Sequence, residues 1–278
     1  MSSTVTYTSG TQSITSPTQI NNRIIRLAGT TPSLPTAPLI NLTGLLATYA
    51  LDKVEVLGTS ATPNYGWVES DPETFTTFTK GVRVSHGTLT TDANSGFTFE
   101  GKSVITNDGT LDALGGRYHS SLYTLNGSVL VGENSSADFS DVHLTGHGTV
   151  KLTAESATVS AGGIGGVDAG VHFDLTEGGT LNIDNGMNFL GHVDIGCQAS
   201  VNIDTPVFDT APLGAVSEIW HARSDVLDLL GSAGQDVAHI QFARGTPKLY
   251  AAPNTTTGGV SVSTHFAAGD LPVTVVHS

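Results

Sequence analysis

Cysteine is nearly absent from this chain of 278 residues: Cys197 is the single copy, so no disulfide framework can form within the chain. It stands in a run where apolar and polar residues alternate, and we interpret it as a small buried residue on the inward side of a strand. Long apolar runs are also missing. No stretch has the length of a membrane-crossing helix, so no membrane span is expected.

Basic residues are scarce, with 11 Lys and Arg against 25 Asp and Glu, which gives a net charge of −14. Nucleic acids and anionic membranes are bound through basic patches, so we expect no nucleic-acid partner. Charged residues of both signs make up only 13% of the chain. Ser, Thr, Asn and Gly must therefore cover much of the surface.

What the sequence does contain is a recurring phrase of a small residue, a hydroxyl residue and an aliphatic residue. Its copies start at intervals of 22, 18, 21, 31 and 20 residues. They are Gly87-Thr88-Leu89, Gly109-Thr110-Leu111, Gly127-Ser128-Val129, Gly148-Thr149-Val150, Gly179-Thr180-Leu181 and Ala199-Ser200-Val201. Repetition near 20 residues is typical of a solenoid, whose units are too short to bury their own apolar faces and share one core.

Alternation inside the repeats indicates strands rather than helices. Between residues 193 and 204, apolar residues take one set of alternate positions and polar residues take the other. This is the period of a strand with one buried face. We predict an all-β chain folded as a parallel β-helix. The residues expected to point inward are Val193, Ile195, Cys197, Val201 and Ile203.

Four regions are expected along the chain. Residues 1–17 are predicted to form an N-terminal strand or tail, and residues 18–81 an N-terminal cap over the open end of the core. The β-helix proper is expected over residues 82–207. Residues 208–278 contain strand-like runs 8 to 13 residues apart, which predict a C-terminal β-rich cap built from antiparallel meanders.

Helical spacing of apolar residues appears within the expected N-terminal cap. Residues 20–27 predict a short amphipathic helix or an irregular plug, and residues 42–49 favour a second helix, with a pair of short strands as the alternative. Trp67, Phe75 and Phe78 are expected to fill the wide end of the core. Farther along, we expect the glycine-rich segment 161–170 to form an extra partial coil or a protruding loop.

Two segments resemble the passenger repeats of bacterial autotransporter and filamentous-haemagglutinin-type adhesins. They are Gly-Gly-Thr-Leu-Asn-Ile-Asp at 178–184 and Ala-Ser-Val-Asn-Ile-Asp at 199–204. The segment 225–262 is similar to the endings of repetitive secreted bacterial surface proteins. The resemblance implies a right-handed β-helix, adhesive or scaffolding work, and an extracellular or cell-surface location. Because the N-terminal residues lack the pattern of a secretory signal peptide, export without a recognisable signal peptide is expected.

Polysaccharide hydrolases and lyases are a second class compatible with a parallel β-helix. Gly146-His147-Gly148 is similar to the Gly-His-Gly of polygalacturonase-like enzymes, but the sequence has no adjacent pair of aspartates and no Arg-x-Lys. Cleavage of a glycosidic bond needs two carboxylates flanking it. We therefore predict a protein that is not an enzyme and has no catalytic residue. A carbohydrate-active or tailspike-like enzyme and a passive polysaccharide-binding module are the alternatives.

No metal or cofactor site is expected. His143 and His147 are four residues apart, a spacing that aligns ligands on a helix but not reliably on a strand and turn. Residues 162–167 are similar to the calcium-binding repeat Gly-Gly-x-Gly-x-Asp. However, Val167 occupies the Asp position, and a single copy lacks the stacked neighbours that make such a site.

The N-terminal segment Thr4-Val5-Thr6-Tyr7-Thr8 alternates like a strand and is the predicted self-association site. An extended segment of this kind is suited to pair with an exposed sheet edge of another subunit. A head-to-tail contact does not close on itself and grows into a filament. The partner expected first is therefore a second copy of the chain, with polysaccharide as a further class. A strand folded back on its own rod is the alternative.

Overall fold

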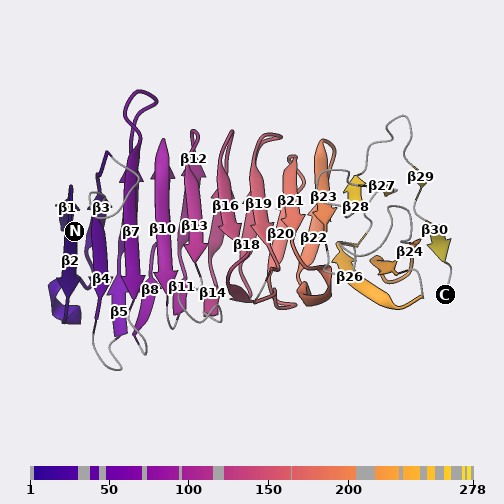
Figure 1. The fold of residues 1–278 in the computed structure, drawn as a ribbon, viewed down its shortest axis with the longest axis horizontal. Coiled ribbons are helices and arrows are strands. Elements are labelled where there is room, and N and C mark those ends of the chain that lie inside the picture. The colour runs from indigo at the N-terminus through magenta and orange to yellow at the C-terminus, as the bar shows by residue number, and fades with distance from the viewer. Residues whose placement is uncertain are drawn as a thin grey trace.

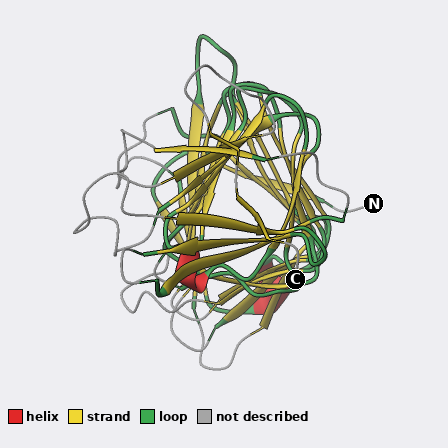
Figure 2. Ribbon diagram, turned by 90° about the vertical axis from the view of Figure 1, so that its right-hand side faces the viewer, coloured by secondary structure: helices red, strands yellow, loops and turns green. Residues whose placement is uncertain are grey.

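The protein is an elongated all-β solenoid of about eight turns in a computed structural model (Figure 1). The described residues are 3–30, 38–43, 48–70, 74–93, 96–114, 122–163, 165–204, 217–231, 234–244, 249–253, 260–263, 271–272 and 274–276. Seen along its long axis, the rod has strands on several sides of a common interior (Figure 2).

Three sheets run along the rod, and their strands pair in parallel from one turn to the next. In the first sheet the parallel strands are β1 (Thr4–Tyr7), β3 (Ile24–Leu27), β6 (Lys53–Leu57), β9 (Val82–Ser85), β12 (Lys102–Thr106), β15 (Ser128–Val131), β18 (Thr149–Leu152), β20 (His172–Leu175) and β22 (His192–Ile195).

The second sheet faces the viewer along most of Figure 1. Its parallel strands are β2 (Thr11–Ile14), β4 (Leu39–Leu42), β7 (Asn64–Ser70), β10 (Gly87–Ala93), β13 (Thr110–Leu114), β16 (Ser136–Phe139), β19 (Thr158–Ala161), β21 (Gly179–Ile183) and β23 (Ala199–Ile203). The third sheet contains β5 (Thr48–Leu51), β8 (Phe75–Phe78), β11 (Gly96–Phe99), β14 (Leu122–Leu125) and β17 (His143–Gly146).

Aliphatic side chains of successive turns stack directly above one another inside the rod. On the second sheet one such column is fully in register and buried, and it consists of Leu89, Leu111, Ala137, Val159, Leu181 and Val201. Aromatic rings from strands of the third sheet also stack in the interior. The ring centroids are 5.2 Å apart for Phe78 and Phe97 and 5.5 Å apart for Phe97 and Tyr123. One shared core therefore holds turns that could not fold alone.

The predicted inward register is confirmed except at one position. Val193, Ile195, Val201 and Ile203 are buried, whereas Cys197 is exposed. Cys197 lies between the end of β22 and the start of β23, where the chain turns from the first sheet to the second. A corner interrupts the period of two, so the apparent alternation across it did not describe a continuous strand.

The predicted helices of the N-terminal region are wrong, because these residues form solenoid strands. In β3, Ile25 and Leu27 are buried, and the strand pairs in parallel with both β1 and β6. The stripe at 42–49 contributes to β4 and β5, so its alternative, a pair of short strands, is confirmed, while residues 44–47 lie outside the described part. The parallel stack thus begins at β1 rather than at residue 82.

The expected aromatic filling of the N-terminal region is partly correct. Phe78 is buried in the core, whereas Trp67 lies half-buried on the outer face of the second sheet, and 53% of the Phe75 surface is exposed. Phe75 and Phe78 stand at opposite ends of the same four-residue strand, β8, and therefore point to opposite faces of the third sheet.

The recurring phrase occurs on two different sheets. Gly87, Gly109, Gly179 and Ala199 stand at or just before strands of the second sheet, whereas the copies at 127–129 and 148–150 lead into the first sheet. The 31-residue interval therefore reflects a change of sheet, not an insertion. Both kinds of corner accommodate the phrase, but the first sheet does not require its hydroxyl, since β20 begins with His172 and β22 with His192.

The glycine-rich segment 161–170 supplies the third side of its own turn. Val167 is buried and forms isolated parallel bridges to Leu144 in the preceding turn and Phe189 in the following one. The following turn carries the short 3-10 helix η3 (Gly186–Asn188) at this side, and the first turn carries η1 (Pro17–Gln19). The segment is therefore part of a regular turn, and neither an extra partial coil nor a protruding loop.

Beyond residue 216 the described strands pair mainly antiparallel, as the meander spacing predicted. They are β24 (Ser217–His221), β25 (Val226–Leu230), β26 (Asp236–Phe242), β27 (Tyr250–Pro253), β28 (Val260–Ser263), β29 (Leu271–Pro272) and β30 (Thr274–Val276). β25 lies antiparallel between β24 and β26. β26 extends the first sheet beside β22, and β28 extends the second beside β23.

Candidate functional site

The outer face of the second sheet carries two columns of mostly polar side chains, which we call the hydroxyl column and the amide column. The hydroxyl column consists of Tyr65, Thr88, Thr110, Ser136, Thr158, Thr180, Ser200 and Ser263. The amide column consists of Trp67, Thr90, Asp112, Asp138, Ser160, Asn182, Asn202 and Ser261. Strand spacing repeats each column at about 4.8 Å along the rod.

Side chains within each column bond to one another across the turns. In the amide column Asn202 Nδ2 donates to Asn182 Oδ1 at 2.9 Å, and Ser261 Oγ donates to Asn202 Oδ1 at 2.6 Å. In the hydroxyl column Thr180 Oγ1 and Ser200 Oγ are 3.3 Å apart. These bonds fix the side chains in one orientation, so the face is a flat and regular array of polar groups.

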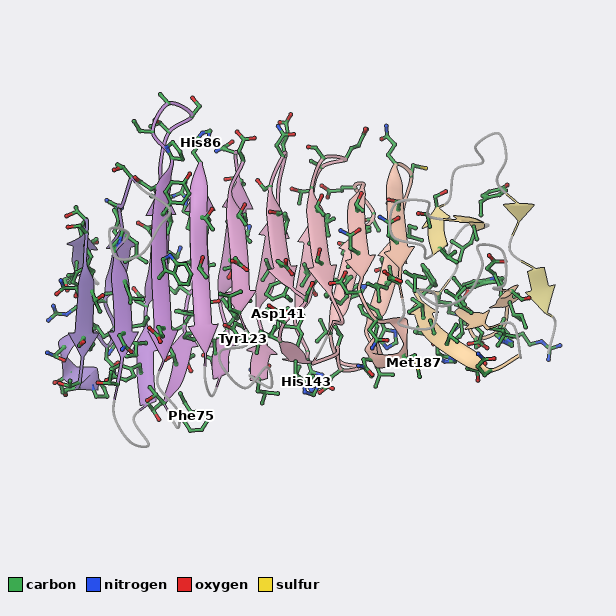
Figure 3. The ribbon with its side chains drawn as sticks, in the orientation of Figure 1. Phe75, His86, Tyr123, Asp141, His143 and Met187 are labelled. Carbon is green, nitrogen blue, oxygen red and sulfur yellow. The ribbon has the colours of Figure 1, made fainter. Side chains whose placement is uncertain are left out.

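Four carboxylates gather where the second sheet turns toward the third side, and we call this group the acidic corner. Its members are Asp138, Asp141, Asp184 and Asp204. Ser140 joins two of them, since its N–H donates to Asp138 Oδ1 at 2.9 Å and its hydroxyl donates to Asp184 Oδ2. Figure 3 labels Asp141 and also His143, which begins β17 of the third sheet.

This contact crosses an intervening turn. Ser140 follows β16 and Asp184 follows β21, while Gly162 follows β19 between them. Gly162 has a φ of +78°, and a Cβ there would face the core side chains of Phe189 and Ile183. Burial by the surrounding protein raises the pKa of Asp184, and the charges of Asp138, Asp204 and Asp141 raise it further against the Ser140 hydrogen bond.

The outer face of the first sheet differs from this site because its charges are paired. Lys151 Nζ lies 2.7 Å from Glu177 Oε1 and 3.4 Å from Asp174 Oδ2. Burial alone would raise the pKa of Asp174, but hydrogen bonds from Thr176 together with Lys151 lower it. His172 Nε2 similarly lies 2.7 Å from Asp194 Oδ2. These contacts hold neighbouring turns together.

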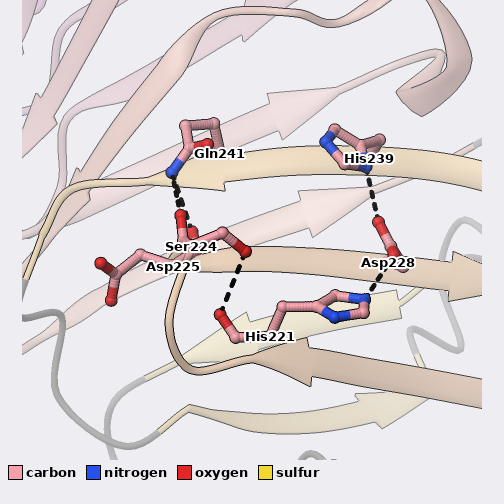
Figure 4. A network of polar contacts seen from close by, with 6 residues as sticks. All are labelled: His221, Ser224, Asp225, Asp228, His239 and Gln241. Carbon is pink, nitrogen blue, oxygen red and sulfur yellow. Dashed lines mark hydrogen bonds and ion pairs between the residues drawn. The ribbon is translucent and has the colours of Figure 1, made fainter. Parts of the chain in front are cut away.

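A network in the antiparallel part brings two histidines to one aspartate (Figure 4). Asp228 on β25 accepts hydrogen bonds from His221 Nε2 at 2.7 Å and from His239 Nδ1 at 2.6 Å. Gln241 Nε2 donates to the carbonyl of Ser224 at 2.8 Å. The carboxylate lies between the two rings, so the nitrogens approach it from different sides. The network joins β24, β25 and β26 rather than forming a pocket for a cation.

The histidines singled out in the sequence do not form a metal site with each other. His143 Nε2 pairs with Asp168 Oδ1 at 2.9 Å, and His147 is exposed at the following corner. Within the part of the chain that the structure describes, no group of three or more His, Cys, Asp or Glu side chains could hold a metal ion. Asp168, one residue after the expected calcium-ligand position, therefore has a histidine as its partner.

The predicted self-association residues form the first strand of the first sheet. Thr4 to Tyr7 make up β1, and Thr8 follows it. Val5 and Tyr7 are half-buried against the core, whereas Thr4, Thr6 and Thr8 are exposed. The strand pairs with β3 of its own chain, as the alternative for this segment predicts. Its other edge has no strand beside it among the described residues.

Comparison with protein-family models, with curated proteins and with solved structures finds no match. The likeness to adhesin passenger repeats therefore remains a prediction, and the solenoid is what the fold supports. None of the described helices is long and apolar enough to cross a membrane.

The sequence did not point to the two columns or to the acidic corner as sites. A signal for the columns was present, since each copy of the recurring phrase places a hydroxyl between a small residue and an aliphatic one. No sequence signal marked the acidic corner, because its aspartates come from turns as far apart as residues 138 and 204.

Proposed function

We propose that this chain is a non-enzymatic structural or adhesive protein, a right-handed β-helical rod that works outside the cell or at its surface. The observation that carries this proposal is the flat, repetitive outer face of the second sheet. Its polar side chains bond along the rod, as Asn202 does to Asn182, and most turns present hydroxyl, amide or carboxylate groups there. Such a face suits a repetitive partner, either a polysaccharide or another copy of the rod.

The strand edges at the N-terminal end support self-association. β1 is the terminal strand of the first sheet and β2 the terminal strand of the second in the described chain. A terminal strand leaves one row of backbone N–H and C=O groups without a strand partner, and this row favours pairing with another chain. Two such edges at the same end give a second copy two strands to extend.

A carbohydrate-active enzyme is the second candidate, because the acidic corner brings carboxylates together. Asp184, whose pKa is raised by burial, lies near Asp138, Asp141 and Asp204, and a glycosidase requires two carboxyl groups in different environments. Against it, Asp184 already bonds to Ser140, and it stands on an open corner instead of in a groove.

Product release from polysaccharides separates the two candidates. We expect the purified protein to release no reducing ends from a panel of pectic, β-glucan, chitin and bacterial capsular polysaccharides beyond the level of a boiled sample. Asp184→Asn and His147→Ala should give the same background. Release by the wild type that is lost specifically in Asp184→Asn would replace the structural proposal with the enzymatic one.

A further inference from the structure

A small pocket lies at the corner between the first and second sheets, near the N-terminal end of the hydroxyl column. It has a volume of about 240 Å³. The turn after β6 forms one wall, and the corners of the next two turns form the others (Figure 3, where His86 is labelled). The residues that provide its chemistry are Thr59, Ser60, Tyr65, His86, Thr88 and Asp108.

Backbone hydrogen bonds hold the pocket walls in place. Thr59 and Thr62 exchange two backbone hydrogen bonds, of 3.0 and 3.1 Å, so the protruding turn is closed on itself. The N–H of Gly58 donates to the carbonyl of Ser85 at 2.8 Å, and the N–H of His86 donates to the carbonyl of Asn107 at 2.9 Å. Because these bonds tie three consecutive turns together, the pocket is formed before any ligand arrives.

Left-handed backbone conformations shape the two corners that line the pocket. His86, Asn107 and Asp108 have φ values of 49°, 53° and 57°, and Asn134 and Gln198 adopt the same region at the corresponding corners of later turns. The conformation therefore belongs to this kind of corner. Gly87 is required here by close packing, since a Cβ at this position would lie 1.9 Å from the carbonyl oxygen of Asn64.

The polar groups of the pocket have unused hydrogen-bonding capacity. His86 Nδ1 is buried and has no hydrogen-bond partner. Asp108 Oδ2 lies 3.8 Å from it, which is too far for a direct hydrogen bond. The Asp108 side chain is 63% exposed and offers its carboxylate to a ligand hydroxyl at the pocket.

From these features we propose that the pocket binds one neutral sugar ring. A sugar ring has an apolar C–H face that packs on an aromatic side chain, here Tyr65, and a rim of hydroxyls that bonds to carboxylate, imidazole and hydroxyl groups. The pocket is smaller than the roughly 300–1,000 Å³ typical of drug-sized ligands, so it accommodates a single ring. The Asp108 carboxylate and the net charge of −14 disfavour acidic sugars.

The same geometry gives a longer glycan a path along the rod. Tyr65 and Thr88 line the pocket and are also the first two members of the hydroxyl column. A chain anchored by one ring in the pocket would continue over the column, turn by turn. This inference names a ligand class for the adhesive role proposed above and rests on that role. Its test reads sugar binding directly, independently of assembly or catalysis.

Saturation-transfer NMR with simple glycosides tests the pocket. The probes are the methyl glycosides of glucose, galactose and mannose, with glucuronate as the acidic comparison. We expect at least one neutral glycoside to bind the wild type with a Kd in the mM range, about 1–10 mM. Asp108→Asn keeps a side chain that tolerates positive φ but removes the charge, and it should weaken this binding about tenfold.

Glu133→Gln is the matched control for this experiment. Glu133 is an exposed residue in the turn between β15 and β16, the same kind of corner one turn beyond Asp108, and its substitution removes the same charge outside the pocket. Binding to this variant should equal that of the wild type. The proposal is overturned if no neutral glycoside binds, if glucuronate binds more tightly than all three, or if Asp108→Asn binds as the wild type does.

Discussion

Replacing Ile195 with aspartate is expected to destabilise the protein by about 4 kcal/mol, which is large for a single substitution. Ile195 is 5% exposed and is the last residue of β22, where it pairs with Leu175 of β20. An aspartate there would be buried without a partner. For a chain of this size the midpoint of thermal unfolding should fall by about 10 °C.

Ser200→Asp introduces the same charge on the outward side of the neighbouring strand β23. Ser200 belongs to the hydroxyl column and loses only its bond to Thr180. Its unfolding midpoint should stay close to that of the wild type, because surface substitutions usually change stability by less than about 0.5 kcal/mol. If circular dichroism melts show Ile195→Asp and Ser200→Asp to be equally stable, the inward register is wrong.

Substituting Gly146 by alanine is expected to cost about 3 kcal/mol or more, through two effects that add. Gly146 ends β17 with a φ of +101°, a conformation that strains any residue with a Cβ. A Cβ would also lie 2.3 Å from the carbonyl oxygen of Leu125 in the preceding turn. Since that oxygen belongs to the backbone of a packed strand, the stacking of two turns must change to make room.

Gly234→Ala separates the two effects. Gly234 also has a positive φ, +78°, but a Cβ there meets no atom within 4 Å. This variant should therefore show the backbone strain alone, about 1 kcal/mol in urea denaturation. If Gly146→Ala and Gly234→Ala lower the free energy of unfolding equally, the close stacking of turns at Gly146 adds nothing to the cost of the alanine.

Alternation and recurrence were sufficient to predict the parallel solenoid and much of its inward face. They act locally: a strand such as β21 buries Leu181 and Ile183 and leaves Asn182 outside because side chains alternate. Alternation and recurrence could not show to which of the sheets each strand belongs. The same phrase of small residue, hydroxyl and aliphatic starts strands on both sheets, so the 31-residue interval looked like an insertion.

The N-terminal helices were mispredicted for a related physical reason. Apolar residues such as Ile20, Ile24 and Leu27 fall at spacings compatible with a helix, but the burial of Ile25 and Leu27 follows the period of a strand. Pairing with β1 and β6 outweighs the local pattern. The pocket was beyond sequence reasoning, because Thr59, His86 and Asp108 meet only after successive turns have stacked.

The orientation of the edge strands allows their free side to be blocked without disturbing the fold. In β1 the carbonyls of Ser3 and Tyr7 accept bonds from β3 and the residue after it, so the backbone groups of Thr6 face the open edge. In β2 the carbonyls of Gly10 and Ile14 accept bonds from β4 and the residue after it, which leaves Ser13 on the open edge. Proline at these exposed positions removes only the outward N–H groups.

Electron microscopy and sedimentation velocity of the wild type beside Thr6→Pro/Ser13→Pro test the self-associating rod most directly. At a protein concentration of about 50 μM, ample for μM affinities, the wild type should form end-to-end assemblies. The double variant, with an unchanged thermal midpoint, should sediment as a monomer. A wild type that stays monomeric, or a double variant that assembles equally well, would contradict association through the β1 and β2 edges.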